Sequence, residues 1–251
     1  MGEMVTRGDL PHWYVPGAAH FVTYRLADTI PIEVLGRLRA ERELRVLLLG
    51  KRGADNWDNK SRAHKQFFAA YDQYLDQGLG KGWLESEDVA NIIIDNLYHH
   101  HQTKYQLLEY TVMPNHVHVL FVPMDTDASS VRHGADATKI SISRIPTDLV
   151  FEQDNFSEEV IDTESPLAKI MHSLKSYTAN EANRFLNREG RFWQRESYDH
   201  WVRDHEELER IAEYIVQNPV QAKLVSNAWD WHYGSAYDRK HVREKRLPEW
   251  W

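Results

Sequence analysis

The alternation of apolar and polar residues along the chain predicts four β-strands. The clearest lies in the stretch YTVMPNHVHVLFVP, residues 110–123, where two histidines alternate with apolar side chains. Successive side chains of a strand point to opposite faces of the sheet, so His116 and His118 share one face and the apolar residues beside them share the other. The remaining strands are predicted at residues 20–26, 105–113 and 192–202.

Longer segments with apolar residues at helical spacing predict five helices. The last of them, at 206–217, follows Asp204, a residue suited to capping a helix. We expect Pro219 to limit this helix, because the residue before a proline avoids the α region. A polar loop is predicted at 51–60. The other helices are predicted at residues 31–50, 61–79, 86–101 and 166–187.

The order of these elements is close to that of a ferredoxin-like α+β fold with an antiparallel sheet. It runs strand, helices, strand, strand, helix, strand, helix, so the helical region at 31–101 is inserted after the first strand. With 251 residues the chain is long enough for one large domain. We therefore expect a single domain over residues 1–251 that ends in a tail at 226–251, which lies on the surface or touches a partner.

Acidic residues are concentrated in one part of the chain, which has a net charge of −8. Residues 124–164 contain ten acids and three bases and lack periodicity, which predicts a long acidic loop or inserted subdomain. Residues 165–203 contain seven bases and four acids. The overall acidity therefore does not exclude an anionic partner for this second segment.

The composition also limits the compartment and the kind of metal site. The chain has no cysteine, so any metal must be held by nitrogen and oxygen donors. It has no apolar run of about 18 residues, the length typical of a membrane span. The N-terminus lacks the apolar core of a secretory signal. We expect a cytoplasmic protein with no membrane partner.

Two predicted elements carry candidate chemistry. His116 and His118 form a ready pair of nitrogen ligands on one strand face. In the last predicted helix Tyr214 and Asn218 are four residues apart and so lie on one face, with Gln217 nearby. If that helix packs across the histidine face, a divalent ion could be held beside a nucleophilic tyrosine and polarise a phosphate. Spacing alone also allows incidental histidines on a surface strand and a half-buried tyrosine on an amphipathic helix.

Three motifs resemble a known family. The HVH motif at 116–118 resembles the His-hydrophobic-His motif of single-tyrosine HUH nucleases. The segments FWQRESYDH at 192–200 and EYIVQNPVQAKLV at 213–225 resemble part of the IS200-like transposases, most closely their REP-associated tyrosine transposase branch. The resemblance is loose over residues 10–123 and good over residues 165–233.

This resemblance implies an HUH nuclease fold and a metal-dependent transposase that cleaves and joins single-stranded DNA at hairpin-forming repeats. Tyr214 is implied as the nucleophile, which forms a 5′-phosphotyrosine and releases a 3′-hydroxyl. His116, His118 and Asn218 are implied as ligands of Mg²⁺ or Mn²⁺.

The chain also contains two rival candidates for the nucleophile and several candidate DNA contacts. Tyr177, on a basic helix, and Tyr198, in the aromatic segment, are rival nucleophiles, but only Tyr214 has the Asn-Pro context of the family. Basic residues are expected to contact phosphates and an aromatic residue to stack on bases. The candidates are Lys175, Trp193, Gln194, Arg195 and Arg203, and each could instead be a solvated charge or a core residue.

The acidic segment at 124–164 and the inserted helices at 31–101 depart from the family pattern. They leave open the path of the DNA and the choice between monomer and homodimer. One alternative function is a domesticated DNA-hairpin-binding protein without strand transfer. Another is a metal phosphoesterase in which water attacks in place of tyrosine, and a trapped protein–DNA adduct distinguishes these possibilities.

Overall fold

The computed structural model of the chain describes residues 4–7, 11–51, 57–78, 80–124, 165–241 and 247. The predicted acidic insertion at 124–164 lies outside these residues except for Met124.

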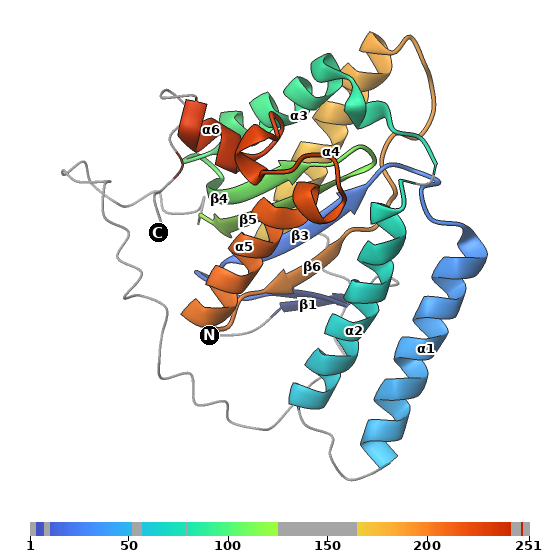
Figure 1. The fold of residues 1–251 in the computed structure, drawn as a ribbon. Helices are drawn as coiled ribbons and strands as arrows, with labels where there is room; N and C mark the ends of the chain where they lie inside the picture. Colours follow the sequence, from blue (N-terminus) through green and yellow to red (C-terminus); the bar gives the residue numbers. More distant parts are fainter. Residues whose placement is uncertain are drawn as a thin grey trace, which may run out of the picture.

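A four-stranded antiparallel sheet forms the centre of the structure (Figure 1). Its strands are β3 (His20–Arg25), β4 (Tyr105–Val112), β5 (His116–Pro123) and β6 (Tyr198–Trp201). They lie in the order β4-β5-β3-β6, and every neighbouring pair is antiparallel. This is the ferredoxin-like arrangement, and the predicted α+β class is confirmed.

Two features of the strands differ from the prediction. The strand expected at 192–202 is shorter, because its first half joins β3 only through a single bridge between Leu26 and Trp193. A separate two-stranded sheet of β1 (Met4–Arg7) and β2 (Pro11–Tyr14) was not predicted. Strands of four residues are too short to show a clear alternation of apolar and polar side chains.

The described residues form six α-helices, five of which correspond to predicted ones. Helix α2 begins inside the segment predicted as a polar loop, and α6 was not predicted. Within the parts of the chain that the structure describes, none of the helices has the length and apolar character needed to cross a membrane. The helices are α1 (Ile32–Lys51), α2 (Trp57–Asp76), α3 (Glu87–His100), α4 (Pro166–Phe185), α5 (His205–Gln221) and α6 (Ser235–His241).

Helix α5 continues through Pro219, so the prediction that this proline limits the helix is wrong. A proline inside a helix lacks the N–H that would donate to the carbonyl four residues earlier. The loss is confined to the last turn, where other bonds persist. The Ala222 amide donates to the Asn218 carbonyl at 2.9 Å, and the Leu224 amide donates to the Pro219 carbonyl at 2.9 Å.

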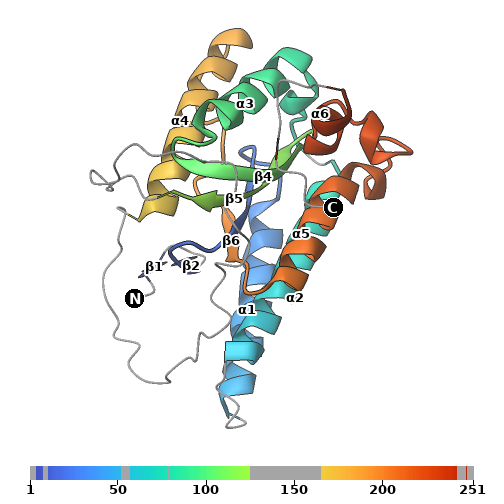
Figure 2. The ribbon, with the colours of Figure 1, turned by 90° about the vertical axis from the view of Figure 1, so that its left-hand side faces the viewer.

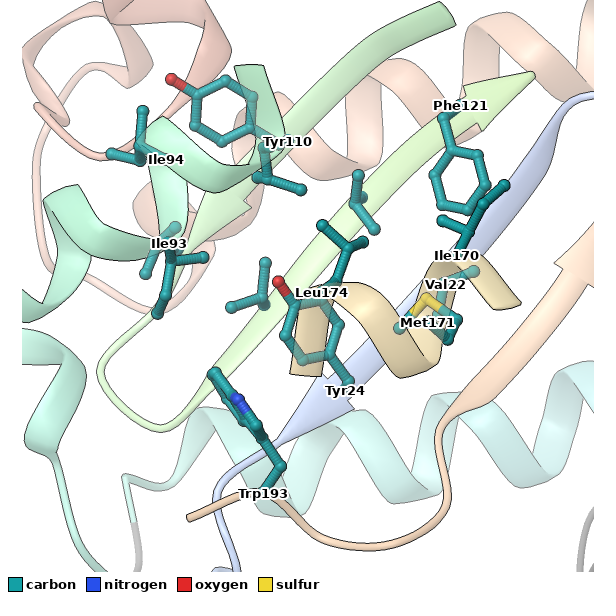
Figure 3. Close-up of a cluster of buried hydrophobic side chains, with 14 of the residues drawn as sticks. Val22, Tyr24, Ile93, Ile94, Tyr110, Phe121, Ile170, Met171, Leu174 and Trp193 are labelled. Carbon is teal, nitrogen blue, oxygen red and sulfur yellow. The ribbon is translucent and has the colours of Figure 1, made fainter. Parts of the chain in front are cut away.

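The helices cover both faces of the sheet (Figures 1 and 2). Helices α3 and α4 pack on one face, where Val117, Val119 and Phe121 of β5 enter the core as predicted. Figure 3 shows this core, in which the Tyr24 and Trp193 rings meet edge to face at a centroid distance of 4.8 Å. Helices α2 and α5 pack on the opposite face, and α1 pairs with α2. The histidine face of β5 is therefore turned toward α2 and α5.

The C-terminal segment covers the edge of the sheet at β4. The Val112 amide donates to the Tyr233 carbonyl at 2.8 Å. Helix α6 then brings Arg239 beside Glu109, with Nη2 and Oε2 2.7 Å apart. Within the tail predicted over 226–251, the described segment around Tyr233 and helix α6 therefore packs against the edge of the sheet.

Candidate active site

The two histidines lie at the start of β5, after a tight turn closed by a hydrogen bond from the Met113 amide to the His116 carbonyl at 2.8 Å. Both imidazoles are fully buried, with 0% exposed surface. His116 Nδ1 lies 2.6 Å from Asn115 Oδ1, and His118 Nδ1 lies 2.7 Å from Thr23 Oγ1 on the neighbouring strand. An amide oxygen can only accept, so His116 donates its Nδ1 hydrogen there, and a donated Nδ1 hydrogen likewise suits the contact of His118.

The His116 Nε2 atom therefore presents a lone pair, and it lies 3.0 Å from His118 Nε2. Burial lowers the pKa of His116 to about 3, and burial together with the charge of His116 holds the pKa of His118 well below its usual range. Both rings are therefore neutral at pH 7, the form that binds metals. Bonding through Nδ1 is also the usual way in which proteins orient a metal-binding imidazole.

A carboxylate that we did not predict completes this group. Asp72 of α2 is buried, and its Oδ1 lies 3.4 Å from His118 Nε2. Asp72, His116 and His118 offer ligand atoms within 4.8 Å of one another, a group that could hold a metal ion. Burial raises the pKa of the Asp72 carboxyl to about 7, although a hydrogen bond from Tyr214 lowers it.

The sequence does contain a signal for Asp72. It lies on the aromatic stripe of α2, one turn after Phe68 and next to Tyr71. An acidic residue on the buried stripe of a helix is unusual unless it has a partner.

Helix α5 brings Tyr214 and Asn218 to the same place. The Tyr214 hydroxyl donates to Asp72 Oδ2, and Asn218 Nδ2 donates to the Tyr214 oxygen at 3.3 Å. Burial and the charge of Asp72 raise the pKa of the Tyr214 phenol. Asn218 is fully buried, and its Oδ1 has no hydrogen-bond partner among the described residues.

Aromatic rings surround these polar groups. The Tyr214 ring lies 5.4 Å from the His118 ring, and Phe21 and Phe68 pack against both of them. The two rival tyrosines lie elsewhere. Tyr198 is buried and stacks on Phe68 at 4.2 Å, whereas Tyr177 is exposed on α4, across the sheet from the histidines.

Two of the predicted DNA contacts serve the fold. Trp193 is 5% exposed, and its Nε1 donates to Thr178 Oγ1 at 2.9 Å. Its ring is therefore part of the core, and the expected stacking on DNA bases does not fit this structure. The backbone amide of Gln194 donates to the Arg25 carbonyl at 2.9 Å, which ties the segment to β3.

The three basic candidates differ in their surroundings. Lys175 Nζ donates to the Arg195 carbonyl at 2.7 Å, and burial lowers the pKa of Lys175 to about 8. The side chain of Arg195 is exposed. Arg203 pairs with Glu207 at 3.1 Å. Of the three, Arg195 is the most accessible to a phosphate.

The structure thus places a buried histidine pair on an antiparallel sheet and a tyrosine on a helix that faces it. A curated relative from Haemophilus influenzae, described as "Putative REP-associated tyrosine transposase", is 36% identical over 69 residues. This match confirms the resemblance to REP-associated tyrosine transposases. It covers 28% of this chain and only 38% of the relative.

The chain was also compared with family models and with solved structures. No family model matches the chain. A solved structure of a REP-associated tyrosine transposase bound to a REP hairpin aligns with 97% of this chain and 89% of its own length, at 14% identity and a TM-score of 0.46.

Proposed function

We propose that the protein is a metal-dependent HUH transposase that cleaves and joins single-stranded DNA at hairpin-forming repeats through a 5′-phosphotyrosine. One observation carries this proposal. The Tyr214 hydroxyl lies between Asp72 and Asn218, beside a pair of neutral imidazoles whose Nε2 atoms lie 3.0 Å apart. The match to a REP-associated tyrosine transposase supports the same function.

The donors of this site fit Mg²⁺ or Mn²⁺. Nitrogen and carboxylate oxygen ligands suit Mn²⁺, and Mg²⁺ accepts a site with few protein ligands if water completes it. His116 and His118 would hold the ion, and the resemblance implies the Asn218 oxygen as the third ligand. A bound divalent ion would polarise the scissile phosphate.

The residues of the chain supply the covalent chemistry. The Tyr214 oxygen attacks the phosphorus atom, and its proton leaves along the hydrogen bond toward Asp72. The bond from phosphorus to the 3′ oxygen breaks, and that oxygen takes up a proton to become a free 3′-hydroxyl. A 3′-hydroxyl of a second strand can attack the phosphotyrosine in turn, which restores a phosphodiester bond and the phenol without external energy.

The test combines labelled single-stranded hairpin DNAs, Mn²⁺ or Mg²⁺ and denaturing gels, with Tyr214→Phe and the matched Tyr177→Phe variant alongside. We expect a covalent adduct that only Tyr214→Phe abolishes. Cleavage without any adduct would point to attack by water and would contradict the proposal.

One observation favours an alternative, a DNA-hairpin-binding protein without strand transfer. Both histidines are fully buried beneath the aromatic rings of α2 and α5, so a phosphate has no direct access to them in this conformation. In the same assay this alternative predicts hairpin binding without cleavage under any metal condition.

A further inference from the structure

We propose that Asp72, rather than Asn218, is the third metal ligand, so that the inserted helix α2 is part of the active site. This inference rests on the proposed metal-dependent function. The resemblance implies a ligand one turn after the tyrosine, on its own helix. The structure brings a carboxylate to the histidines from a different helix, within the region at 31–101 that departs from the family pattern.

The position of Asp72 is that of a ligand. Its Oδ1 lies 3.4 Å from His118 Nε2, which in turn lies 3.0 Å from His116 Nε2. Asn115 and Thr23 engage the two Nδ1 atoms, so both Nε2 atoms are left to face one cation. Asp72 Oδ1 is buried and has no hydrogen-bond partner among the described residues, so it remains available to a cation.

Charge gives a second argument. Two neutral imidazoles and an amide would leave both charges of a divalent ion without compensation in a buried site. The Asp72 carboxylate supplies one negative charge, and an anionic oxygen is the ligand that hard cations prefer.

Asn218 is placed for a different role. Its Nδ2 donates to the Tyr214 oxygen at 3.3 Å, so the amide group is turned with its nitrogen toward the phenol. A donor at that point stabilises negative charge on the tyrosine oxygen and holds the ring in position. Asn218 Oδ1 also lacks a hydrogen-bond partner among the described residues, so the contact of its Nδ2 assigns Asn218 as a positioning residue and the metal titration tests its oxygen as the rival ligand.

Metal binding would add a bond between α2 and the sheet. Polar contacts of α2 include the Tyr214 hydrogen bond to Asp72, the hydrogen bond from Arg25 Nε of β3 to the Tyr71 hydroxyl at 2.8 Å, and the bond from Asn115 Nδ2 to the Leu75 carbonyl at 3.1 Å. A ligand bond from Asp72 would join α2 directly to β5. We expect metal to slow amide hydrogen exchange in α2.

The experiment measures Mn²⁺ affinity of the full chain by titration calorimetry, without DNA. His116→Ala is the positive control, Asp72→Ala and Asp72→Asn remove the proposed oxygen or its charge, and Asn218→Ala removes the rival ligand. Asp88→Asn, which removes an exposed carboxylate on α3, is the matched control. We expect Asp72→Ala to weaken binding by more than about 100-fold, and Asn218→Ala and Asp88→Asn by less than about threefold.

Hydrogen exchange of α2 with and without Mn²⁺ gives a readout that does not depend on activity. Protection should appear in the wild type and be absent in Asp72→Asn, whose near-identical shape preserves the fold. The inference is overturned if Asn218→Ala loses the metal while Asp72→Ala retains it. A wild-type protein that binds no metal would contradict the proposed metal dependence itself. That outcome differs from metal binding that depends on Asn218, which would contradict only the role of Asp72.

Discussion

The Tyr214 hydroxyl of α5 donates a hydrogen bond to the Asp72 carboxylate of α2, although the two residues are 142 positions apart. This bond joins the candidate nucleophile to the candidate metal group, because the other oxygen of Asp72 lies 3.4 Å from His118. Both helices pack on the same face of the sheet (Figure 1). Within this chain, α2, α5 and β5 therefore bring the carboxylate, the tyrosine and the histidines together.

The first prediction concerns the pH dependence of stability without metal. Burial raises the pKa of Asp72 in the folded chain to about 7, well above the value of about 3.9 for an unfolded chain. The folded state therefore binds this proton more tightly, and its contribution to stability is present at low pH and lost as pH rises through about 7. Between pH 5 and pH 8 the wild type should lose about 3 kcal/mol of unfolding free energy, and Asp72→Asn should not show this loss.

Urea unfolding with a chelator present, at several pH values, measures this difference. Asparagine does not titrate, so the change with pH isolates the carboxyl of Asp72. A constant difference between the two proteins across this range would show that Asp72 is not the buried acid that the structure describes.

The histidine pair could be placed from the sequence because a strand has a period of two, and the Tyr214–Asn218 pair because a helix brings residues four apart onto one face. Asp72 could not be placed this way. Local periodicity assigns a residue to the buried side of its helix but does not say which distant helix it meets. The same limit applies to Trp193, since an apolar pattern does not separate a core indole from a ring that stacks on DNA.

The second prediction separates these two roles of Trp193. Its ring is buried against Tyr24, so Trp193→Ala should lower the unfolding free energy by about 3–5 kcal/mol. The exposed neighbour Arg195→Ala is the matched control and should change it by less than about 0.5 kcal/mol. Chemical denaturation checks both values. An unchanged unfolding free energy in Trp193→Ala would mean that the ring is not in the core.

The third prediction concerns the contact of Arg195 with a DNA phosphate. Each phosphate neutralised on a single strand contributes about 0.7 to the slope of log affinity against log salt concentration. Arg195→Ala should reduce the magnitude of that slope by about this amount for a single-stranded hairpin tail, measured by fluorescence anisotropy at several salt concentrations. Arg203→Ala should leave the slope unchanged, because Arg203 is paired with Glu207. Equal slopes in Arg195→Ala and wild type would exclude the phosphate contact.

The fourth prediction concerns the C-terminal segment. Glu109 is fully buried on β4, where the Arg239 guanidinium lies 2.7 Å from its Oε2 and Ser235 also donates to it. Burial raises the pKa of the Glu109 carboxyl, and the hydrogen bond and charge of Arg239 lower it. Removing only the Arg239 guanidinium would leave the buried Glu109 carboxylate without its ion-pair partner, which typically costs about 3–5 kcal/mol.

Arg239→Met should therefore lower the unfolding free energy by that amount, whereas Lys240→Met, at the exposed next position of α6, should leave it nearly unchanged. Replacing both partners, as in Glu109→Gln with Arg239→Met, should recover part of the loss, because no buried charge then remains. Denaturant unfolding of the wild type, Glu109→Gln, Arg239→Met and the double variant forms a double-mutant cycle. Additive losses in that cycle would mean that the ion pair does not hold α6 to the edge of the sheet.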